Sequence, residues 1–330
     1  MYPDLLQTGD EVRVIAPSRS MTILDPYVIE IAVKRLTQMG LRVTFGAHVN
    51  SSRPFYNSAT VQERLSDLHQ AFADARVKAI LTVVGGYSCN QLLPYIDYDL
   101  IRRNPKILCG LSDITALQNA IYSCTGMVTF SGPHFSNFGM KYGFEYTQRY
   151  FQKLFMQEGN SFSVESSQEY SSDVWYQVQD ARTFQLNSGM AAIQPGCAAG
   201  TIIGGNLCTL NLLLGTKYLP SLRDTILFLE DTCNLNSNYF LEFDRQLEAL
   251  TQQPDFSGVR GIVLGRAEDA AGMTEELWRL MILSKPALAG IPVIMQANIG
   301  HTTPIFTFPI GGRCAMHAAE HCRLEIQKHE

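Results

Sequence analysis

The first half of the chain alternates short apolar runs with segments of helical spacing. This rhythm of strand, helix and strand is typical of a parallel sheet with helices on both faces. We expect strands at Val12–Ala16, Leu41–Phe45, Lys78–Val84, Ile107–Cys109 and Val128–Phe130, and helices at Tyr27–Met39, Val61–Phe72 and Ile114–Tyr122. Ligands bind such sheets at the carboxyl ends of the strands. The pattern therefore predicts an α/β N-terminal domain with a site in the loops that follow its strands.

The chain of 330 residues is long for one hydrophobic core, because single cores stop growing at roughly 250–300 residues. Residues 157–188 are polar and rich in Ser and Gln, and a second set of strand and helix patterns begins near Met190. We therefore predict an N-terminal α/β domain at 1–156, a linker or cleft loop at 157–188, and a smaller mixed α/β domain at 189–330.

Composition narrows the class of protein. The formal net charge is -5 and the basic residues are scattered, whereas a nucleic-acid backbone would require a basic stripe. None of the eight cysteines forms a C-x-x-C pair, and buried free thiols suit a reducing compartment. No apolar run approaches the roughly 18–20 residues of a membrane span, and the first residues lack the pattern of a signal peptide. We expect a cytoplasmic globular protein that binds neither nucleic acid nor membrane.

The segment Lys106-Ile-Leu-Cys-Gly-Leu-Ser112-Asp113 joins an apolar strand to a helix. A sharp turn of this kind lifts a serine hydroxyl clear of the sheet and directs the helix dipole at the same space. Ser112 is then a candidate nucleophile, and the N–H of Asp113 is a candidate oxyanion donor. The same pattern also suits a simple helix cap by Ser112 or Asp113.

A double glycine, Gly85-Gly86, follows the predicted strand that ends at Val84. Glycine lets the backbone approach a ligand closely. The N–H of Gly86 could supply a second oxyanion donor, although a short Gly-Gly also fits an ordinary tight turn or a phosphate-binding loop.

Two further strand ends carry groups that suit proton transfer. Glu230 and Asp231 follow the apolar run Ile226–Leu229, and His301 follows Gly300 after another apolar run. A carboxylate can hold a histidine in one tautomer, and a histidine can act as general base near neutral pH. A capping or solvated carboxylate and a polar loop histidine are the alternatives. A serine, a glutamate and a histidine at strand ends form a candidate triad, but the sequence alone does not show that they meet.

The chain resembles the LD-carboxypeptidase family of serine peptidases, and within it the microcin C self-immunity peptidases. The resemblance covers nearly the whole chain, and its most specific stretches are Gly85–Asp97, Cys109–Leu117, Thr129–His134, Ile203–Leu210, Leu227–Asp231 and Gly300-His301. It implies Ser112 as nucleophile, His301 as general base and Glu230 as its orienting carboxylate. It also implies a Rossmann-like (flavodoxin-like) first domain, oxyanion donors around Gly86 and Asp113, no metal or other cofactor, and a homodimer.

The resemblance leaves two substrates open. One is an aminoacyl or peptidyl nucleotide such as processed microcin C, cleaved at an amide bond to give self-immunity or detoxification. The other is a murein tetrapeptide, cut before its terminal D-alanine in cell-wall recycling. We favour the first, for which Trp175 on the polar loop could stack on a base; packing of Trp175 against the linker is the alternative. Met190 stands where immunity-type members have tryptophan.

Two other interpretations have sequence support. The Gly-Gly loop would serve a non-catalytic nucleotide- or sugar-binding module equally well, and tolerance of Ser112→Ala would reveal such a module. The C-terminal segment that contains Cys314, His317, His321 and Cys322 has the residue types of a metal site. We expect two short strands there and no metal.

Overall fold

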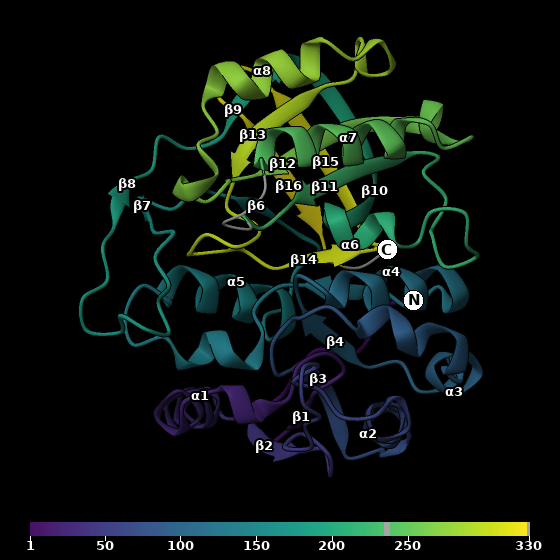
Figure 1. The fold of residues 1–330 in the computed structure, drawn as a ribbon, viewed down its shortest axis with the longest axis vertical. Coiled ribbons are helices and arrows are strands. Elements are labelled where there is room, and N and C mark those ends of the chain that lie inside the picture. The colour runs from purple at the N-terminus through teal and green to yellow at the C-terminus, as the bar shows by residue number, and fades with distance from the viewer. Residues whose placement is uncertain (234–237, 329–330) are drawn as a thin grey trace.

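The computed structural model describes residues 1–233 and 238–328, which form two α/β domains stacked one above the other (Figure 1). The first domain is built on a six-stranded sheet of order β14-β5-β4-β3-β1-β2. Its strands are β1 (Glu11–Ile15), β2 (Arg42–Phe45), β3 (Val77–Thr82), β4 (Ile107–Gly110), β5 (Thr129–Ser131) and β14 (Phe308–Ile310). Strands β1 to β5 run parallel, and β14 pairs antiparallel with β5. The predicted fold class, with its Rossmann-like parallel sheet, is confirmed.

Helices of the first domain follow its strands in the predicted rhythm. They are α1 (Pro26–Gln38), α2 (Val61–Ala73), α3 (Tyr98–Arg103), α4 (Ile114–Thr125) and α5 (Glu145–Phe155). Helix α2 begins with a capping box, in which the Thr60 hydroxyl accepts from the Glu63 N–H and the Glu63 carboxylate accepts from the Thr60 N–H. Helix α4 is buried over most of its length, because it lies between the two sheets (Figure 1).

The second domain is built on a mixed sheet of eight strands, in the order β6-β16-β15-β10-β11-β12-β13-β9. The strands are β6 (Ser161–Val164), β9 (Ala191–Gln194), β10 (Gly196–Asn206), β11 (Thr225–Glu230), β12 (Val259–Gly265), β13 (Val293–Ala297), β15 (Arg313–Ala318) and β16 (Arg323–Gln327). The central strands β10 to β13 are parallel. Helices α6 (Leu207–Asn211), α7 (Tyr239–Thr251) and α8 (Glu275–Leu283) complete the domain.

Short elements connect these layers. The 3-10 helices are η1 (Met21–Ile23), η2 (Cys89–Tyr95), η3 (Phe135–Gly139), η4 (Phe256–Gly258), η5 (Asp269–Ala271) and η6 (Pro286–Leu288). A small hairpin of β7 (Glu169–Tyr170) and β8 (Gln185–Leu186) stands apart from both sheets at the left of Figure 1.

Two segments cross the boundaries expected from the sequence. Residues 157–188 were predicted to be a linker or cleft loop, but β6 lies in this range, alternates exposed and buried residues, and pairs with β16. Part of that range therefore belongs to the second sheet. Strand β14 comes from the C-terminal part of the chain and extends the first sheet. Each sheet thus contains one strand from outside the range predicted for its domain.

Candidate active site

Ser112 lies in the sharp turn between β4 and α4. Its φ is +61°, in the left-handed region that residues other than glycine seldom adopt. Such strain is maintained only where the surrounding structure imposes it, and it occurs often at functional sites. The turn presents the Ser112 hydroxyl above the carboxyl ends of the strands, as in a nucleophile elbow.

The Asp113 carboxylate is buried and anchors this turn to two distant loops. It accepts hydrogen bonds from the Ser18 hydroxyl at 2.5 Å and from the N–H groups of Ser88 and Cys89, each at 2.9 Å. Asp113 precedes α4, yet its side chain makes no capping hydrogen bond to that helix. Asp113 occupies the N-cap position of α4, but its side chain does not cap the helix, because its Oδ2 accepts from the loops that follow β1 and β3.

Arg64 also forms hydrogen bonds with the loops that follow β1 and β3. Its guanidinium is buried and donates to the carbonyls of Pro17 and Ser88, at 2.9 and 3.0 Å, and to the Gln91 side chain at 2.8 Å. Ser88 is thus bonded to a buried cation and to the buried Asp113 carboxylate. This role of Arg64 was not predicted from the sequence, since a lone arginine inside an amphipathic helix pattern carries no local signal.

The loop after β3 lies directly against Ser112. A Cβ atom on Gly85 would lie 2.9 Å from the Ser112 Cβ, so only glycine allows this approach. Gly86 is packed as closely on Ser18. Among the hydrogen bonds of the described residues, none uses the N–H of Gly86 or that of Asp113. Both donors therefore remain available beside the serine.

His301 and Glu230 reach Ser112 from the second domain. The His301 Nε2 lies 3.1 Å from the Ser112 Oγ, and its Nδ1 lies 2.7 Å from the Glu230 Oε2. The three side chains that the sequence placed at strand ends are therefore connected by hydrogen bonds. Gly300 permits this arrangement, because its φ is +98° and a Cβ there would lie 2.6 Å from the Glu230 Oε2.

The protonation of His301 depends on its carboxylate neighbour. The Glu230 side chain is 5% exposed and that of His301 is 20% exposed. Burial lowers the pKa of His301, but the charge of Glu230 and its hydrogen bond, together with Glu268 and Asp231, raise that pKa to about 9. The imidazolium is thus strongly stabilised, as a group that accepts a proton during a reaction requires.

A second histidine, His134, lines the same cavity, and no role was predicted for it from the sequence. Burial and the charges of His301 and Arg19 lower the pKa of His134 to about 3, so its imidazole is neutral. Its Nδ1 lies 2.8 Å from the Thr82 hydroxyl. Arg19 donates from Nε to the Gly85 carbonyl at 2.9 Å. The feature of the sequence that could have identified His134 as a site residue is its position after Ser131-Gly-Pro, at the end of β5.

These groups line one cavity of about 570 Å³ between the domains. Ser112, Asp113, Gly86 and His301 lie on its wall, together with Trp175 from the polar loop. That loop is held over the cavity by backbone pairing of Ser171 with Thr303, two residues after His301. The ring of Trp175 is partly buried and meets Tyr176 edge to face, with centroids 5.7 Å apart. Met190 is not among the residues that line this cavity.

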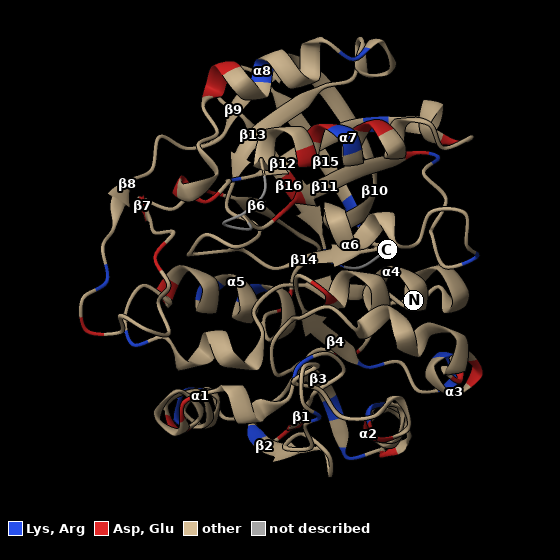
Figure 2. Ribbon diagram, in the orientation of Figure 1, with Lys and Arg blue, Asp and Glu red and all other residues tan. Residues whose placement is uncertain are grey.

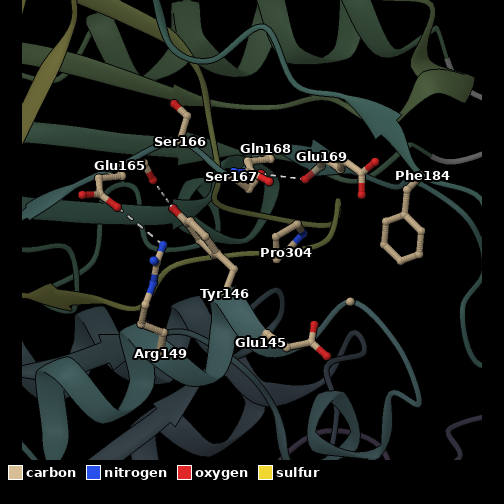
Figure 3. A pocket seen from close by; sticks show the side chains of 11 residues that line it. Glu145, Tyr146, Arg149, Glu165, Ser166, Ser167, Gln168, Glu169, Phe184 and Pro304 are labelled. Carbon is tan, nitrogen blue, oxygen red and sulfur yellow. Dashed lines mark hydrogen bonds and ion pairs between the residues drawn. The ribbon is translucent and has the colours of Figure 1, made fainter.

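A second cavity, of about 420 Å³, lies beside Pro304 and Phe184 (Figure 3). Its polar groups are largely occupied with one another: Tyr146 donates to the Glu165 carbonyl, Arg149 pairs with the Glu165 carboxylate, and Ser167 donates to the Glu169 carbonyl. Its lining contains no histidine or cysteine. The candidate triad lines the first cavity and not this one.

Other sequence candidates are placed elsewhere. Cys314 and His317 alternate in β15, so Cys314 is buried and His317 is exposed on the opposite face. Within residues 1–233 and 238–328 no group of three or more His, Cys, Asp or Glu side chains is arranged to hold a metal ion.

None of the described helices is both long enough and apolar enough to cross a membrane. Figure 2 shows both signs of charge side by side on α7 and α8.

Comparison with protein families identifies both domains. The LD-carboxypeptidase N-terminal domain matches residues 12–132, and the LD-carboxypeptidase C-terminal domain matches residues 199–316. The chain belongs to the LD-carboxypeptidase family. It is a serine peptidase, so the alternative of a non-catalytic binding module no longer applies.

Three curated relatives illustrate the range of this family. The putative carboxypeptidase YocD of Bacillus subtilis is 48% identical, with all of both chains covered. The probable murein peptide carboxypeptidase of B. subtilis is 32% identical over 96% of this chain and 92% of its own. The microcin C7 self-immunity protein MccF of Escherichia coli is 30% identical over 94% of this chain and 91% of its own.

Solved structures of related proteins have the same fold as this chain. An MccF-like protein from Bacillus anthracis superposes with a TM-score of 0.96 at 50% identity, covering 99% of each chain. MccF in complex with aspartyl sulfamoyl adenosine superposes with a TM-score of 0.89 at 28% identity, covering 99% of this chain and 98% of its own.

Proposed function

We propose that this protein hydrolyses an amide bond with Ser112 as nucleophile, His301 as general base and Glu230 as the carboxylate that orients His301. The observation that carries the proposal is the continuous hydrogen-bonded series from Ser112 Oγ through His301 to Glu230. His301 takes the serine proton as Ser112 attacks the carbonyl, and then gives it to the leaving nitrogen. Water, activated by the same histidine, releases the acyl group from Ser112.

The tetrahedral intermediate requires donors for its negative oxygen. The N–H groups of Gly86 and Asp113 are the candidates, because both lie beside Ser112 and neither is used by another described residue. The hydrogen bonds of the Asp113 carboxylate hold these two backbone segments together before substrate binds. Donors fixed in advance need no reorganisation when the oxyanion forms, and one such donor typically contributes 10²–10³-fold in kcat.

For the substrate we propose an aminoacyl or peptidyl nucleotide of the processed microcin C type, cleaved to give self-immunity or detoxification. Two features support it: Trp175 lines the cavity, where its ring could stack on a base, and MccF relatives have been solved with aminoacyl sulfamoyl nucleosides. The second candidate is a murein tetrapeptide, supported by the relative named a murein peptide carboxypeptidase. From the family resemblance we also propose a cytoplasmic homodimer, which light scattering and cell fractionation would test.

The deciding experiment compares wild type with Ser112→Ala on two substrates, an aminoacyl sulfamoyl adenosine and a murein tetrapeptide, with products read by mass spectrometry. Cleavage of the nucleotide analogue by wild type alone supports the immunity-type activity. Cleavage of the tetrapeptide alone keeps the mechanism and moves the protein to cell-wall recycling. Equal cleavage by both proteins, or none by either, would overturn the assignment of Ser112.

A further inference from the structure

Two carboxylates line the active-site cavity beside the triad without a cation to neutralise them. Asp231, next to Glu230, accepts through Oδ1 from the Asn206 amide at 2.9 Å and from the Thr232 N–H at 2.8 Å. Glu268 accepts through Oε2 from the Thr232 hydroxyl at 3.0 Å and from the Cys233 N–H at 2.6 Å. These neutral donors hold one oxygen of each carboxylate and leave the other, Asp231 Oδ2 and Glu268 Oε1, without a described partner.

Neither carboxylate forms an ion pair with a described residue, although His301 lies close enough for its charge to act on both. Among the described residues, no Lys, Arg or His forms an ion pair with either carboxylate, and the adjacent stretch 234–237 has the sequence Asn-Leu-Asn-Ser. Arg19 is the one Lys or Arg that the structure places in the cavity lining, and it is bound to the Gly85 carbonyl of the first domain. Glu230 is compensated by His301. The wall of the second domain therefore carries three carboxylates around one histidine, and Asp231 and Glu268 have no ion pair of their own among the described residues.

Maintaining such charges without a partner has an energetic cost. Burial, with the neighbouring Glu230, raises the pKa of Asp231 to about 6, although its hydrogen bonds and His301 act in the opposite direction. A chain that only needed a polar wall could use amides at these positions without that cost. Carboxylates that converge on a cavity from two strand ends, β11 and β12, instead suit a cation that arrives with the ligand.

We propose that Asp231 and Glu268 together bind the ammonium group of the acyl portion of the substrate. This inference rests on the proposed function and adds that the enzyme requires a free amine near the scissile carbonyl. An aminoacyl nucleotide carries one on its α-carbon, and a diamino acid in a murein peptide carries one on its side chain. The negative wall would exclude acyl groups that lack the amine, because the desolvated carboxylates would then remain unpaired.

The same contact would couple binding to catalysis. Glu268 and Asp231 contribute to the raised pKa of His301. An ammonium bound between them cancels part of their field, so substrate binding should lower the pKa of His301 and favour its neutral form. The base would then become active chiefly when an amine-bearing substrate is bound.

The test uses alanyl sulfamoyl adenosine and its propionyl analogue, which lacks only the amine, with wild type, Asp231→Asn/Glu268→Gln and the control Glu320→Gln at an exposed residue outside the cavity. We expect wild type and control to prefer the alanyl compound by at least about 30-fold in kcat/KM. The double variant should lose that preference, with a ratio of kcat/KM for the two compounds near one. For the alanyl compound, the pKa in the kcat profile should lie below that in the kcat/KM profile, since these report the substrate complex and the free enzyme.

Binding of L-alaninamide, measured by calorimetry, separates this inference from the proposed function. We expect binding to wild type and Glu320→Gln, and none to the double variant. Absence of binding to wild type, or an unchanged substrate preference in the double variant, would overturn the ammonium site even if the nucleotide is cleaved. Binding of L-alaninamide by a protein that cleaves neither the nucleotide analogue nor the murein tetrapeptide would refute the proposed function and retain the ammonium site.

Discussion

The two sides of the active site are built on different principles. On the first-domain side, Ser112 stands in a strained turn, and buried side chains tie the surrounding loops together: the Asp113 carboxylate accepts from three donors and Arg64 donates to the carbonyls of Pro17 and Ser88. On the second-domain side, Glu230, Asp231 and Glu268 gather around one histidine, and two of these carboxylates lack a cation. The first-domain side fixes the positions of backbone and side chains around Ser112, and the second-domain side carries negative charge.

The difference indicates how a change on each side should act. Buried networks with every partner satisfied resist motion, and breaking one displaces the backbone that it holds. Uncompensated charges shift the pKa values of neighbouring groups with little displacement. Substitutions on the first side should therefore reduce rate and stability together, whereas substitutions on the second side should change pH dependence and specificity.

Glu230→Gln should have the largest effect. The amide cannot hold His301 in the tautomer that places its lone pair toward Ser112, and in another serine peptidase the equivalent change costs about 10⁴-fold in kcat. We expect a loss of about 10³–10⁴-fold in kcat with a nearly normal melting temperature. The pKa of His301 should also fall, because Glu230 is the main group that raises it.

Steady-state kinetics and NMR titration of His301 in both proteins would measure these effects, with Glu242→Gln on the outer helix α7 as the control. A Glu230→Gln enzyme that keeps wild-type kcat would show that the carboxylate does not orient the base.

Asp113→Ala should have the next largest effect and should act through geometry. It leaves the Ser18 hydroxyl and the N–H groups of Ser88 and Cys89 without their acceptor, and each unsatisfied group costs about 1–3 kcal/mol. We expect the free energy of unfolding to fall by about 3–5 kcal/mol and kcat to fall by about 10²-fold, as for loss of one oxyanion donor.

Asp113→Asn is the matched control, because its amide oxygen can still accept these hydrogen bonds. It should recover most of the stability and rate in urea unfolding and in single-turnover cleavage. Equal losses in the alanine and asparagine variants would show that the charge of Asp113 matters more than its hydrogen bonds.

The sequence predicted the triad residues because strands of a parallel sheet end at one edge, so polar groups just after apolar runs collect there. The structure brings Ser112, Glu230 and His301 together as that argument expects. The anchoring role of Asp113 could not be predicted from the sequence, because its partner Ser18 lies 95 residues away. Local patterns carry no information on such pairs.

Strand β6 was missed for a related reason. Its four residues alternate in burial within a polar stretch that otherwise reads as a loop, and only pairing with β16 at the far end of the chain makes them a strand. The position of Trp175 likewise depends on the pairing of Ser171 with Thr303. Contacts distant in sequence thus decided both features.

The pH profile should distinguish the charged side from the rigid side. His301 must be neutral to accept the serine proton, and its pKa is about 9 in the free enzyme. We expect kcat/KM to rise about tenfold per pH unit below that value and to level off above it.

Stability should change in the opposite direction. The folded pKa of His301 exceeds its ordinary value of 6.5, so its contribution is complete below pH 6.5 and is lost as pH rises toward 9.

Urea unfolding and cleavage, each measured from pH 6 to pH 10, would test both limbs, with Ser112→Ala as the control for stability. A flat kcat/KM profile over this range would contradict the assignment of His301 as the base.

Trp175→Leu should have the smallest effect and should affect only one of the two candidate substrates. Stacking of a base on an aromatic ring contributes about 1–3 kcal/mol, so we expect KM for an aminoacyl sulfamoyl adenosine to rise about tenfold with little change in kcat. Cleavage of a murein tetrapeptide should be unaffected, since it has no base to stack. Tyr95→Leu, which removes an exposed aromatic side chain outside the cavity lining, is the control. Equal increases in KM for both substrates would mean that Trp175 shapes the loop rather than binding a base, and would place substrate choice with the charged wall of the second domain.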